Sequence, residues 1–254
     1  MIKLNCDMGE SFAAWTMGDD SAVMPHIDMA NIACGFHAGG PAIMAQTINL
    51  ALEHDVTIGA HPAYPDLAGF GRRTLHFSAP ELKAILHYQI GAMQALCDHA
   101  GAELSYVKPH GALYNDMQRD QELFELVCRV MAEVNQSRFA KSQQPALYLL
   151  TLAKADNSVQ QRIAAEHQVN LCFEAFADRR YEADGSLRSR HYADAVLTER
   201  DEILAQAIAF ARGQSIAAAD GSALTLAPDT LCVHGDNPES IATVVAIRQA
   251  LLEA

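Results

Sequence analysis

The sequence predicts an α/β protein built as a closed barrel of parallel strands. Apolar, strand-like runs alternate with segments of helical periodicity, which is typical of parallel strands joined by helical crossovers. Short polar clusters follow most of these runs directly, as they do at the carboxyl ends of barrel strands. A length of 254 residues and a hydrophobic content of 50% suit one large core, so we expect a single barrel domain over residues 1–254.

The expected strands are short and separated by helical segments, which favours a closed barrel over an open sheet. In chain order they cover residues 2–6, 29–34, 56–60, 104–107, 146–150, 170–173, 195–197 and 230–233. The run at 195–197 is the weakest of them, so the number of barrel strands, seven or eight, stays open.

Local capping chemistry predicts where several helices begin. Ser78 and Glu81 form a capping box ahead of residues 82–99. Thr198 and Asp201 resemble a second box ahead of residues 203–212. Asn237 followed by Pro238 is a third start signal, a cap with proline in the first turn. We expect the polar stretch 135–144 to be a surface loop.

Composition limits the classes of function. A net charge of −13 argues against nucleic acid or an anionic membrane as a partner and favours a small-molecule substrate. No apolar run approaches the roughly 20 residues of a membrane span, and the chain begins with a strand instead of a leader, so we expect a cytoplasmic protein. The six cysteines form no CxxC pair, so we expect them to be reduced.

The polar clusters carry the chemistry, because parallel barrel strands bring their carboxyl ends to one face. They are NCDMGE at 5–10, CGFH at 34–37, GAHP at 59–62, KPH at 108–110, Glu174 with Asp178 and Arg179, and HGD at 234–236. This many titratable side chains at strand ends predicts an enzyme.

The first three clusters supply acids and histidines. Asp7 and Glu10 end the first strand, although such residues also begin solvated loops and cap helices. His37 precedes an expected helix start at residues 39–41, where free backbone N–H groups bind anions; alone, it would more often be structural. His61 lies between a strand and Pro62, so we expect its ring to point into the barrel mouth.

The later clusters add a lysine and further acids. Lys108 and His110 flank a proline that keeps the backbone extended, so both side chains should lie on the same side. A lysine that ends a buried strand needs an anionic partner. Glu174 ends another strand, and a surface ion pair is the alternative interpretation of Asp178 and Arg179.

The chain resembles the LamB/YcsF family from residue 2 to beyond residue 238. The matching motifs are NCDMGE at 5–10, NIACGFHAG at 31–39, GAHP at 59–62, GFGR at 69–72, VKPHGALYN at 107–115, Glu174 with FADR at 176–179, and VHGD at 233–236. Gly40 stands where the family usually has aspartate, so no acidic or capping role is transferred to that position.

The resemblance implies a distorted (β/α) barrel of about seven parallel strands, similar to the glycoside hydrolase/deacetylase fold. It also implies the A subunit of an ATP-dependent 5-oxoprolinase, which opens 5-oxo-L-proline to L-glutamate while ATP is hydrolysed to ADP and phosphate. Two partner subunits, B and C, would complete the activity. ATP would be a co-substrate with Mg²⁺, and we expect no organic prosthetic group. No G-x-x-x-x-G-K-[ST] loop is present, so the location of ATP stays open.

The reaction needs a base for water, a cation for developing negative charge and a clamp for the substrate carboxylate. The proposed base is His61 or His110, oriented by Asp7 or Asp236. Lys108 would stabilise anionic oxygens, and Arg72 or Arg179 would bind the carboxylate. The candidate catalytic residues are Asp7, His61, Lys108, His110, Glu174 and Asp236. The candidate substrate-binding residues are Asn5, Glu10, His37, Arg72, Asp178, Arg179 and His234.

Two alternatives remain at this stage. One is a metal-dependent amidohydrolase or deacetylase with Asp7, His37, His61 and His234 as ligands, although no H-x-x-x-H spacing supports it. The other is a non-catalytic, substrate-binding subunit, in which the polar clusters serve recognition only. Metal content and activity in the isolated and assembled states would separate these interpretations.

Overall fold

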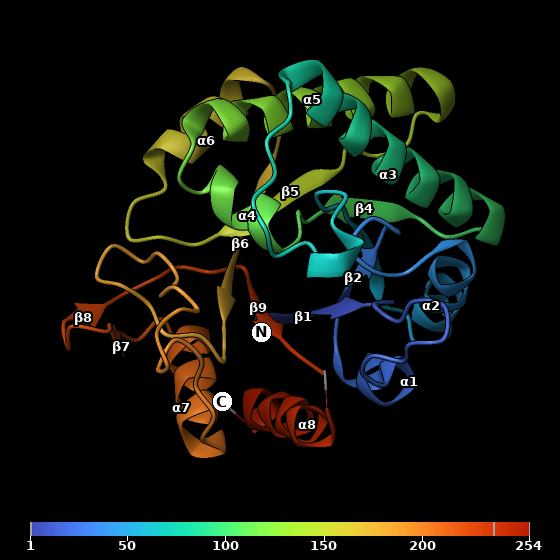
Figure 1. The fold of residues 1–254 in the computed structure, drawn as a ribbon. Helices are drawn as coiled ribbons and strands as arrows, with labels where there is room; N and C mark the ends of the chain where they lie inside the picture. The colour runs from blue at the N-terminus through green and yellow to red at the C-terminus, as the bar shows by residue number, and fades with distance from the viewer. Residues whose placement is uncertain (1, 236, 254) are drawn as a thin grey trace.

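Parallel strands close into a central barrel, and helices surround it (Figure 1). The computed structural model describes residues 2–235 and 237–253. Among these residues, seven strands form the barrel in the order β1-β2-β3-β4-β5-β6-β9, with β9 pairing with both β6 and β1. The barrel strands are β1 (Lys3–Met8), β2 (Met29–Ala33), β3 (Thr57–His61), β4 (Leu104–Val107), β5 (Tyr148–Leu152), β6 (Leu171–Phe176) and β9 (Thr230–Val233). The predicted fold class is therefore confirmed.

Helices connect successive barrel strands and cover the outside of the barrel (Figure 1). They are α1 (Asp20–Val23), α2 (Pro41–Glu53), α3 (Ala79–Ala100), α4 (Gly111–Met117), α5 (Gln121–Ser142), α6 (Ser158–Glu166), α7 (Arg200–Ala211) and α8 (Pro238–Glu253). Two 3-10 turns, η1 (Met24–His26) and η2 (Leu67–Gly69), and a short antiparallel hairpin of β7 (Ile216–Ala217) and β8 (Ala223–Leu224) complete the described elements.

The barrel interior combines apolar packing with one buried polar layer. All residues of β2 and β9 are buried, which explains why both strands are mostly apolar and lack polar alternation. Gly59 pairs with Asn31 on one side and Tyr106 on the other. A Cβ on Gly59 would lie 2.2 Å from the Tyr106 ring, so only glycine lets that ring cross the barrel. The Tyr106 hydroxyl then donates a hydrogen bond to Asn31 (2.7 Å).

Two of the three predicted helix caps are confirmed. The Ser78 backbone N–H donates to the Glu81 carboxylate (2.9 Å), and the capping box begins α3. Asn237 accepts a hydrogen bond from the Ser240 backbone N–H (2.9 Å) at the start of α8. The third prediction is wrong: α7 begins at Arg200 after Glu199, and no side chain caps it, so Thr198 plays no such role.

The weak strand predicted at 195–197 is not part of the barrel. Val196 forms an isolated antiparallel bridge with Arg179, and the Leu197 N–H donates to the Asp178 carbonyl (2.8 Å). The backbone groups of this run thus pair with the chain that leaves β6. Strand β6 itself pairs directly with β9, which closes the barrel with seven strands.

The surface loop predicted at 135–144 is also wrong, because α5 continues to Ser142. Its polar side chains join the helix to the strands nearby. Asn135 exchanges hydrogen bonds with the backbone of Leu147, and the buried Arg138 guanidinium donates to the Leu104 carbonyl (2.9 Å). Polar composition therefore indicated a loop where buried hydrogen bonds stabilise a helix.

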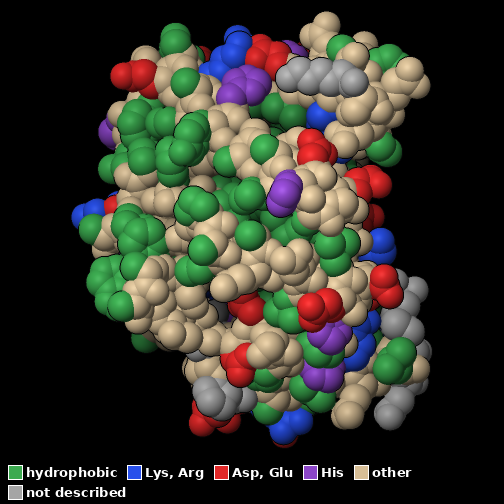
Figure 2. All heavy atoms as spheres, turned by 90° about the vertical axis from the view of Figure 1, so that its right-hand side faces the viewer, with side chains coloured by type: hydrophobic (Ala, Val, Ile, Leu, Met, Phe, Trp, Pro, Cys, Tyr) green, Lys and Arg blue, Asp and Glu red, His purple; other side chains and the backbone are tan. Residues whose placement is uncertain are grey.

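The surface, the helices and the cysteines each bear on what the composition predicts. Figure 2 shows hydrophobic side chains gathered on the left half of one face, whereas acidic side chains are scattered over it. No helix among the described residues combines the length and hydropathy of a membrane span. All six cysteines are free thiols, as expected.

Candidate active site

The predicted polar clusters converge on one cavity of about 540 Å³ at the carboxyl ends of the barrel strands. Asp7 is the second-last residue of β1, His61 is the last residue of β3, and Lys108 directly follows β4. Parallel strands hold these side chains near one another although they are far apart in sequence. The cavity wall includes Asp7, Glu10, His61, Phe70, Arg72, Lys108, His110, Tyr114, Arg119, Phe176, Arg179, Arg188, Arg190, His191 and His234.

Lys108 is the centre of a buried charge network. Its ammonium nitrogen lies 3.0 Å from an Asp7 oxygen and 3.0 Å from a Glu174 oxygen. Asn5 Oδ1 accepts a third bond at 3.1 Å, and Cys232 Sγ lies at 3.2 Å. Only 2% of Lys108 is exposed. The expected anionic partner of this lysine is therefore present twice.

The pKa shifts in this network fix its charges. Burial opposes ionisation of Lys108, but Asp7, Cys232 and Glu174 hold its pKa well above the usual value. Burial raises the pKa of Asp7, yet His61 and Lys108 outweigh it and hold that pKa well below the usual value. Lys108 and Asp7 are therefore charged at neutral pH. Burial raises the pKa of Glu174, and Lys108 opposes this rise.

His61 and His110 point their rings at each other across the floor of the cavity. His61 Nδ1 lies 2.7 Å from the Lys108 carbonyl, and His110 Nε2 lies 2.9 Å from the Phe70 carbonyl. A carbonyl only accepts, so both of these nitrogens carry hydrogen. The remaining two nitrogens, His61 Nε2 and His110 Nδ1, face each other at 2.9 Å. In two neutral rings both nitrogens would present lone pairs, which repel each other. The contact therefore requires an additional proton or another cation between them.

Acidic side chains border the histidine pair. Asp7 Oδ2 lies 3.3 Å from His61 Nε2, and Glu10 Oε1 lies 3.6 Å from His110 Nδ1. His37 stacks on the His110 ring with 3.7 Å between centroids, and its Nε2 lies 3.0 Å from Glu10 Oε1. Burial and the neighbouring histidines lower the pKa of both His37 and His110 well below the usual value. These two rings are therefore neutral at neutral pH.

The opposite wall carries a buried guanidinium. Arg179 donates to the carbonyls of Ala195 (3.3 Å) and Arg188 (2.8 Å). Burial, together with repulsion from Arg190, lowers the pKa of Arg179 to about 10, so it remains charged. Asp178 pairs with His234 (2.7 Å) and not with a surface arginine. The surface ion pair considered for Asp178 and Arg179 is therefore absent from the described contacts.

Most of the candidate residues share this cavity, although at different depths. The wall contains Asp7, Glu10, His61, Arg72, Lys108, His110, Arg179 and His234. Asn5, His37, Glu174 and Asp178 lie behind the wall, in contact with residues that form it. Asp236 lies outside the described residues. The ligand set considered for a metal falls into two groups, His37 and His61 with Glu10 and His110, and Asp7 and His234 with Cys232.

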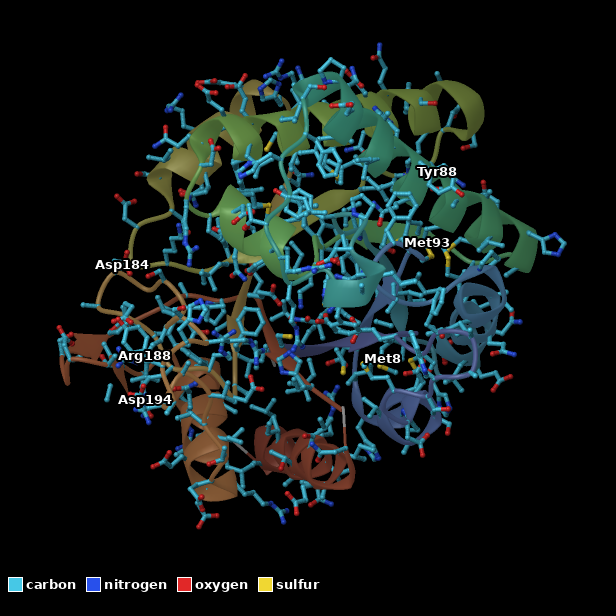
Figure 3. All side chains as sticks on the ribbon, viewed as in Figure 1. Met8, Tyr88, Met93, Asp184, Arg188 and Asp194 are labelled. Atoms are coloured by element: carbon cyan, nitrogen blue, oxygen red, sulfur yellow. The ribbon has the colours of Figure 1, made fainter. Side chains whose placement is uncertain are left out.

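Sequence reasoning missed residues of two kinds. Asn31 and Cys232 contact the Lys108 network from inside strands, where a buried asparagine in an apolar run is the one available signal. Arg188, Arg190 and His191 reach the cavity from the long segment between β6 and α7. In Figure 3 the labelled Arg188 and Asp194 lie side by side in this segment, joined by a 2.8 Å hydrogen bond. No periodicity marks this segment.

The closed parallel barrel and its cluster of buried, interacting titratable groups define an enzyme-type (β/α) barrel with the site at the carboxyl ends of its strands. The chain belongs to the LamB/YcsF family, whose model matches residues 2–254. It is 52% identical over 252 residues to the 5-oxoprolinase A subunit of Pseudomonas fluorescens, covering 99% of this chain and 97% of that protein. It is 54% identical over 250 residues to a 5-oxoprolinase A subunit of Pseudomonas putida, the one numbered 2, covering 98% and 93%.

A solved structure supports the fold independently. The lactam utilization protein from Thermus thermophilus superposes with a TM-score of 0.86 at 35% identity, covering 99% of this chain and 96% of that one. The barrel is thus shared by a protein whose sequence differs at about two thirds of the aligned positions.

The start of α2 has no side-chain cap. Gly40 is the N-cap, and no side chain there accepts a hydrogen bond from the first turn. Pro41 at the first helical position supplies the start signal instead.

Proposed function

We propose that this chain is the A subunit of an ATP-dependent 5-oxoprolinase, which cleaves 5-oxo-L-proline to L-glutamate and hydrolyses ATP to ADP and phosphate. The observation that carries the proposal is the buried ion pair of Lys108 with Asp7 beside the facing rings of His61 and His110. This arrangement, in a chain whose relatives are named as 5-oxoprolinase A subunits, suits hydrolysis of a cyclic amide. The B and C subunits belong to the proposal as partners.

The buried lysine suits the oxygen of the lactam. A five-membered lactam is a poor electrophile, and phosphorylation of its oxygen by ATP would make the carbon accessible to water. The Lys108 ammonium is fixed by three side-chain oxygens, so it needs no reorientation to stabilise negative charge that develops on an oxygen nearby. Lys108 would have this role, and Glu174 would hold it in place.

The histidine pair suits activation of the attacking water. His61 and His110 both line the cavity, and Asp7 lies 3.3 Å from His61 Nε2, close enough to orient it. Proton transfer by such a positioned group contributes typically about 10²–10⁴-fold to a rate. Arg179, charged and fixed by two carbonyls on the other wall, would bind the substrate carboxylate; Arg72 is the other candidate.

The charge of the cavity wall supports an anionic co-substrate. Six of the 18 lysines and arginines line the cavity, whereas only three of the 31 acidic residues do so. A chain with a net charge of −13 thus presents a locally cationic surface, which suits the phosphates of ATP with Mg²⁺. The sequence has no P-loop, so these side chains would have to replace the usual cradle of backbone amides.

The test is glutamate formation from 5-oxoproline with ATP and Mg²⁺, measured with the chain alone and then mixed with the B and C subunits. We expect glutamate only in the mixture, with one ADP formed per glutamate. Activity of the mixture that persists when this chain is left out would make it a non-catalytic component. No activity in either state, with folded proteins, would contradict the proposal and favour a metal-dependent amidohydrolase acting without ATP.

A further inference from the structure

The facing nitrogens of His61 and His110 also define a metal site. We propose that His61 Nε2, His110 Nδ1 and Glu10 Oε1 bind one divalent cation of the zinc class on the floor of the cavity. The proposal does not depend on the substrate assigned above. A bound ion would occupy the lone pairs of His61 Nε2 and His110 Nδ1, so in the metal-loaded protein these rings would hold the ion instead of accepting a proton from water.

The separations of the donor atoms fit a tetrahedral ion. Zinc bonds of about 2.0–2.1 Å to nitrogen and oxygen require neighbouring donors about 3.3 Å apart. His61 Nε2 and His110 Nδ1 are 2.9 Å apart, and His110 Nδ1 and Glu10 Oε1 are 3.6 Å apart. The third pair, His61 Nε2 and Glu10, is bounded at 4.8 Å, which is wider than the ideal separation. One ion can therefore reach all three donors if the Glu10 carboxylate moves toward His61.

The outer nitrogens of both rings are fixed as metal ligands require. A ligating histidine usually donates its other N–H to a carbonyl or carboxylate, which sets the tautomer and turns the lone pair toward the metal. His61 donates to the Lys108 carbonyl at 2.7 Å, and His110 donates to the Phe70 carbonyl at 2.9 Å. Two lone pairs thus converge on one point, and a cation there removes their repulsion.

The charges around the pair favour a divalent ion over a single shared proton. Asp7 Oδ2 lies 3.3 Å from His61 Nε2, and Glu10 Oε1 lies 3.6 Å from His110 Nδ1. Two carboxylates therefore lie beside the converging lone pairs, and a divalent ion is attracted to each of them more strongly than a single proton is.

His37 is excluded as a fourth ligand by its orientation. Its ring is stacked on the His110 ring with 6° between the planes and 3.7 Å between centroids. Metals bind imidazole in the plane of the ring, and one ion cannot lie in two parallel planes. His37 Nε2 instead contacts Glu10 Oε1 at 3.0 Å and positions that carboxylate. Two histidines and one glutamate leave a position open toward the cavity, which is the ligand set of a catalytic zinc site.

Metal content tests the proposal without any substrate. Untagged protein, purified without a nickel column, is dialysed against Zn²⁺ and then against metal-free buffer, and zinc per chain is measured by mass spectrometry. We expect about one zinc per chain in the wild type, and at least a tenfold loss in His61→Ala, His110→Ala and Glu10→Gln. Co²⁺ added to the metal-free protein should give the visible absorption bands of a tetrahedral site.

His87→Ala is the matched control, because His87 pairs with Glu133 on the outside of the barrel and should not affect the bound zinc. Circular dichroism confirms that each variant is folded; if an alanine variant unfolds, His110→Gln replaces it. A wild type with less than a tenth of a zinc per chain and no cobalt bands would overturn the proposal. Unchanged zinc content in folded His61→Ala would overturn it as well.

Discussion

At the scale of single residues, the Lys108 network shows how a polar site can be buried without loss of the fold. A buried ammonium is tolerated only when anions and hydrogen-bond acceptors surround it. Asp7, Glu174 and Asn5 do so from two different strands, β1 and β6. Each partner is at the same time held by Lys108, so removal of the lysine leaves two buried carboxylates without their common cation.

Replacing Lys108 with methionine should therefore abolish turnover and destabilise the protein. Breaking a buried ion pair from one side typically costs about 3–5 kcal/mol of unfolding free energy. Urea unfolding and glutamate formation in the assembled system measure the two effects. Lys83→Met is the matched control: Lys83 forms an exposed pair with Glu133, and its loss should cost less than about 1 kcal/mol.

A double variant separates loss of folding from loss of catalysis. Lys108→Met with Glu174→Gln removes one charge of each sign, so we expect it to regain part of the lost stability and none of the lost turnover. Near-normal turnover in folded Lys108→Met would remove this residue from the mechanism.

The residues that sequence reasoning could find were those at strand ends. Asp7, His61 and Lys108 were predictable because each follows or ends an apolar run. A titratable residue at that position indicates a functional site. Asn31 was not assigned a role, because it lies inside a strand whose other residues are all apolar. Its hydrogen bonds to Asn5 and Asp7 depend on the pairing of β1 with β2, which no local pattern specifies.

At the scale of elements, the segment between β3 and α3 positions His110 of the histidine pair. Asp66 accepts a hydrogen bond from the Gly69 N–H (3.0 Å) and pairs with Arg73, which closes η2 into a tight turn. The turn places the Phe70 carbonyl against His110. Gly71 follows with φ of +63°, and a Cβ there would lie 2.8 Å from the His110 ring.

Gly71→Ala should therefore lower turnover by more than its loss of unfolding free energy would explain. The left-handed backbone costs an alanine roughly 1–2 kcal/mol, and the added methyl also displaces His110. Gly101→Ala is the matched control, since Gly101 has φ of +71° with open space around it. Gly71→Ala should lose more stability in urea than Gly101→Ala, because only its methyl overlaps neighbouring side chains. Only Gly71→Ala should lose at least about tenfold in turnover. Equal turnover in the two variants would contradict this account.

The elements themselves were predictable to different degrees. All seven barrel strands lie at predicted runs, because buried parallel strands are predominantly apolar and can be recognised without tertiary information. The end of α5 was missed, since two of its polar residues, Asn135 and Arg138, hydrogen-bond to the backbone of β4 and of the residues that precede β5. The run at 195–197 has the composition of a strand but pairs with the chain after β6, which only the closed barrel determines.

At the scale of the whole molecule, the charge of the cavity wall is opposite in sign to the net charge of the chain. The chain as a whole is strongly acidic, yet the cavity concentrates arginines from three separate segments of the chain. Arg72 follows η2, Arg119 follows α4, Arg179 follows β6, and Arg190 lies further along the segment to α7. Acidic surroundings repel polyanions elsewhere on the surface, so a phosphate chain would be directed to this face.

Arg119→Glu should consequently weaken binding of tripolyphosphate, a probe for the phosphate chain alone, by about tenfold or more, because it replaces attraction by repulsion at the rim. Isothermal titration calorimetry of the wild type at about 50 and 200 mM salt should also show weaker binding at the higher salt, as screening requires. The matched control is Arg162→Glu, on the exterior helix α6, where Arg162 pairs with Glu166. It changes the net charge equally, so a similar loss of affinity in both variants would mean that overall charge, and not the cavity rim, governs anion binding.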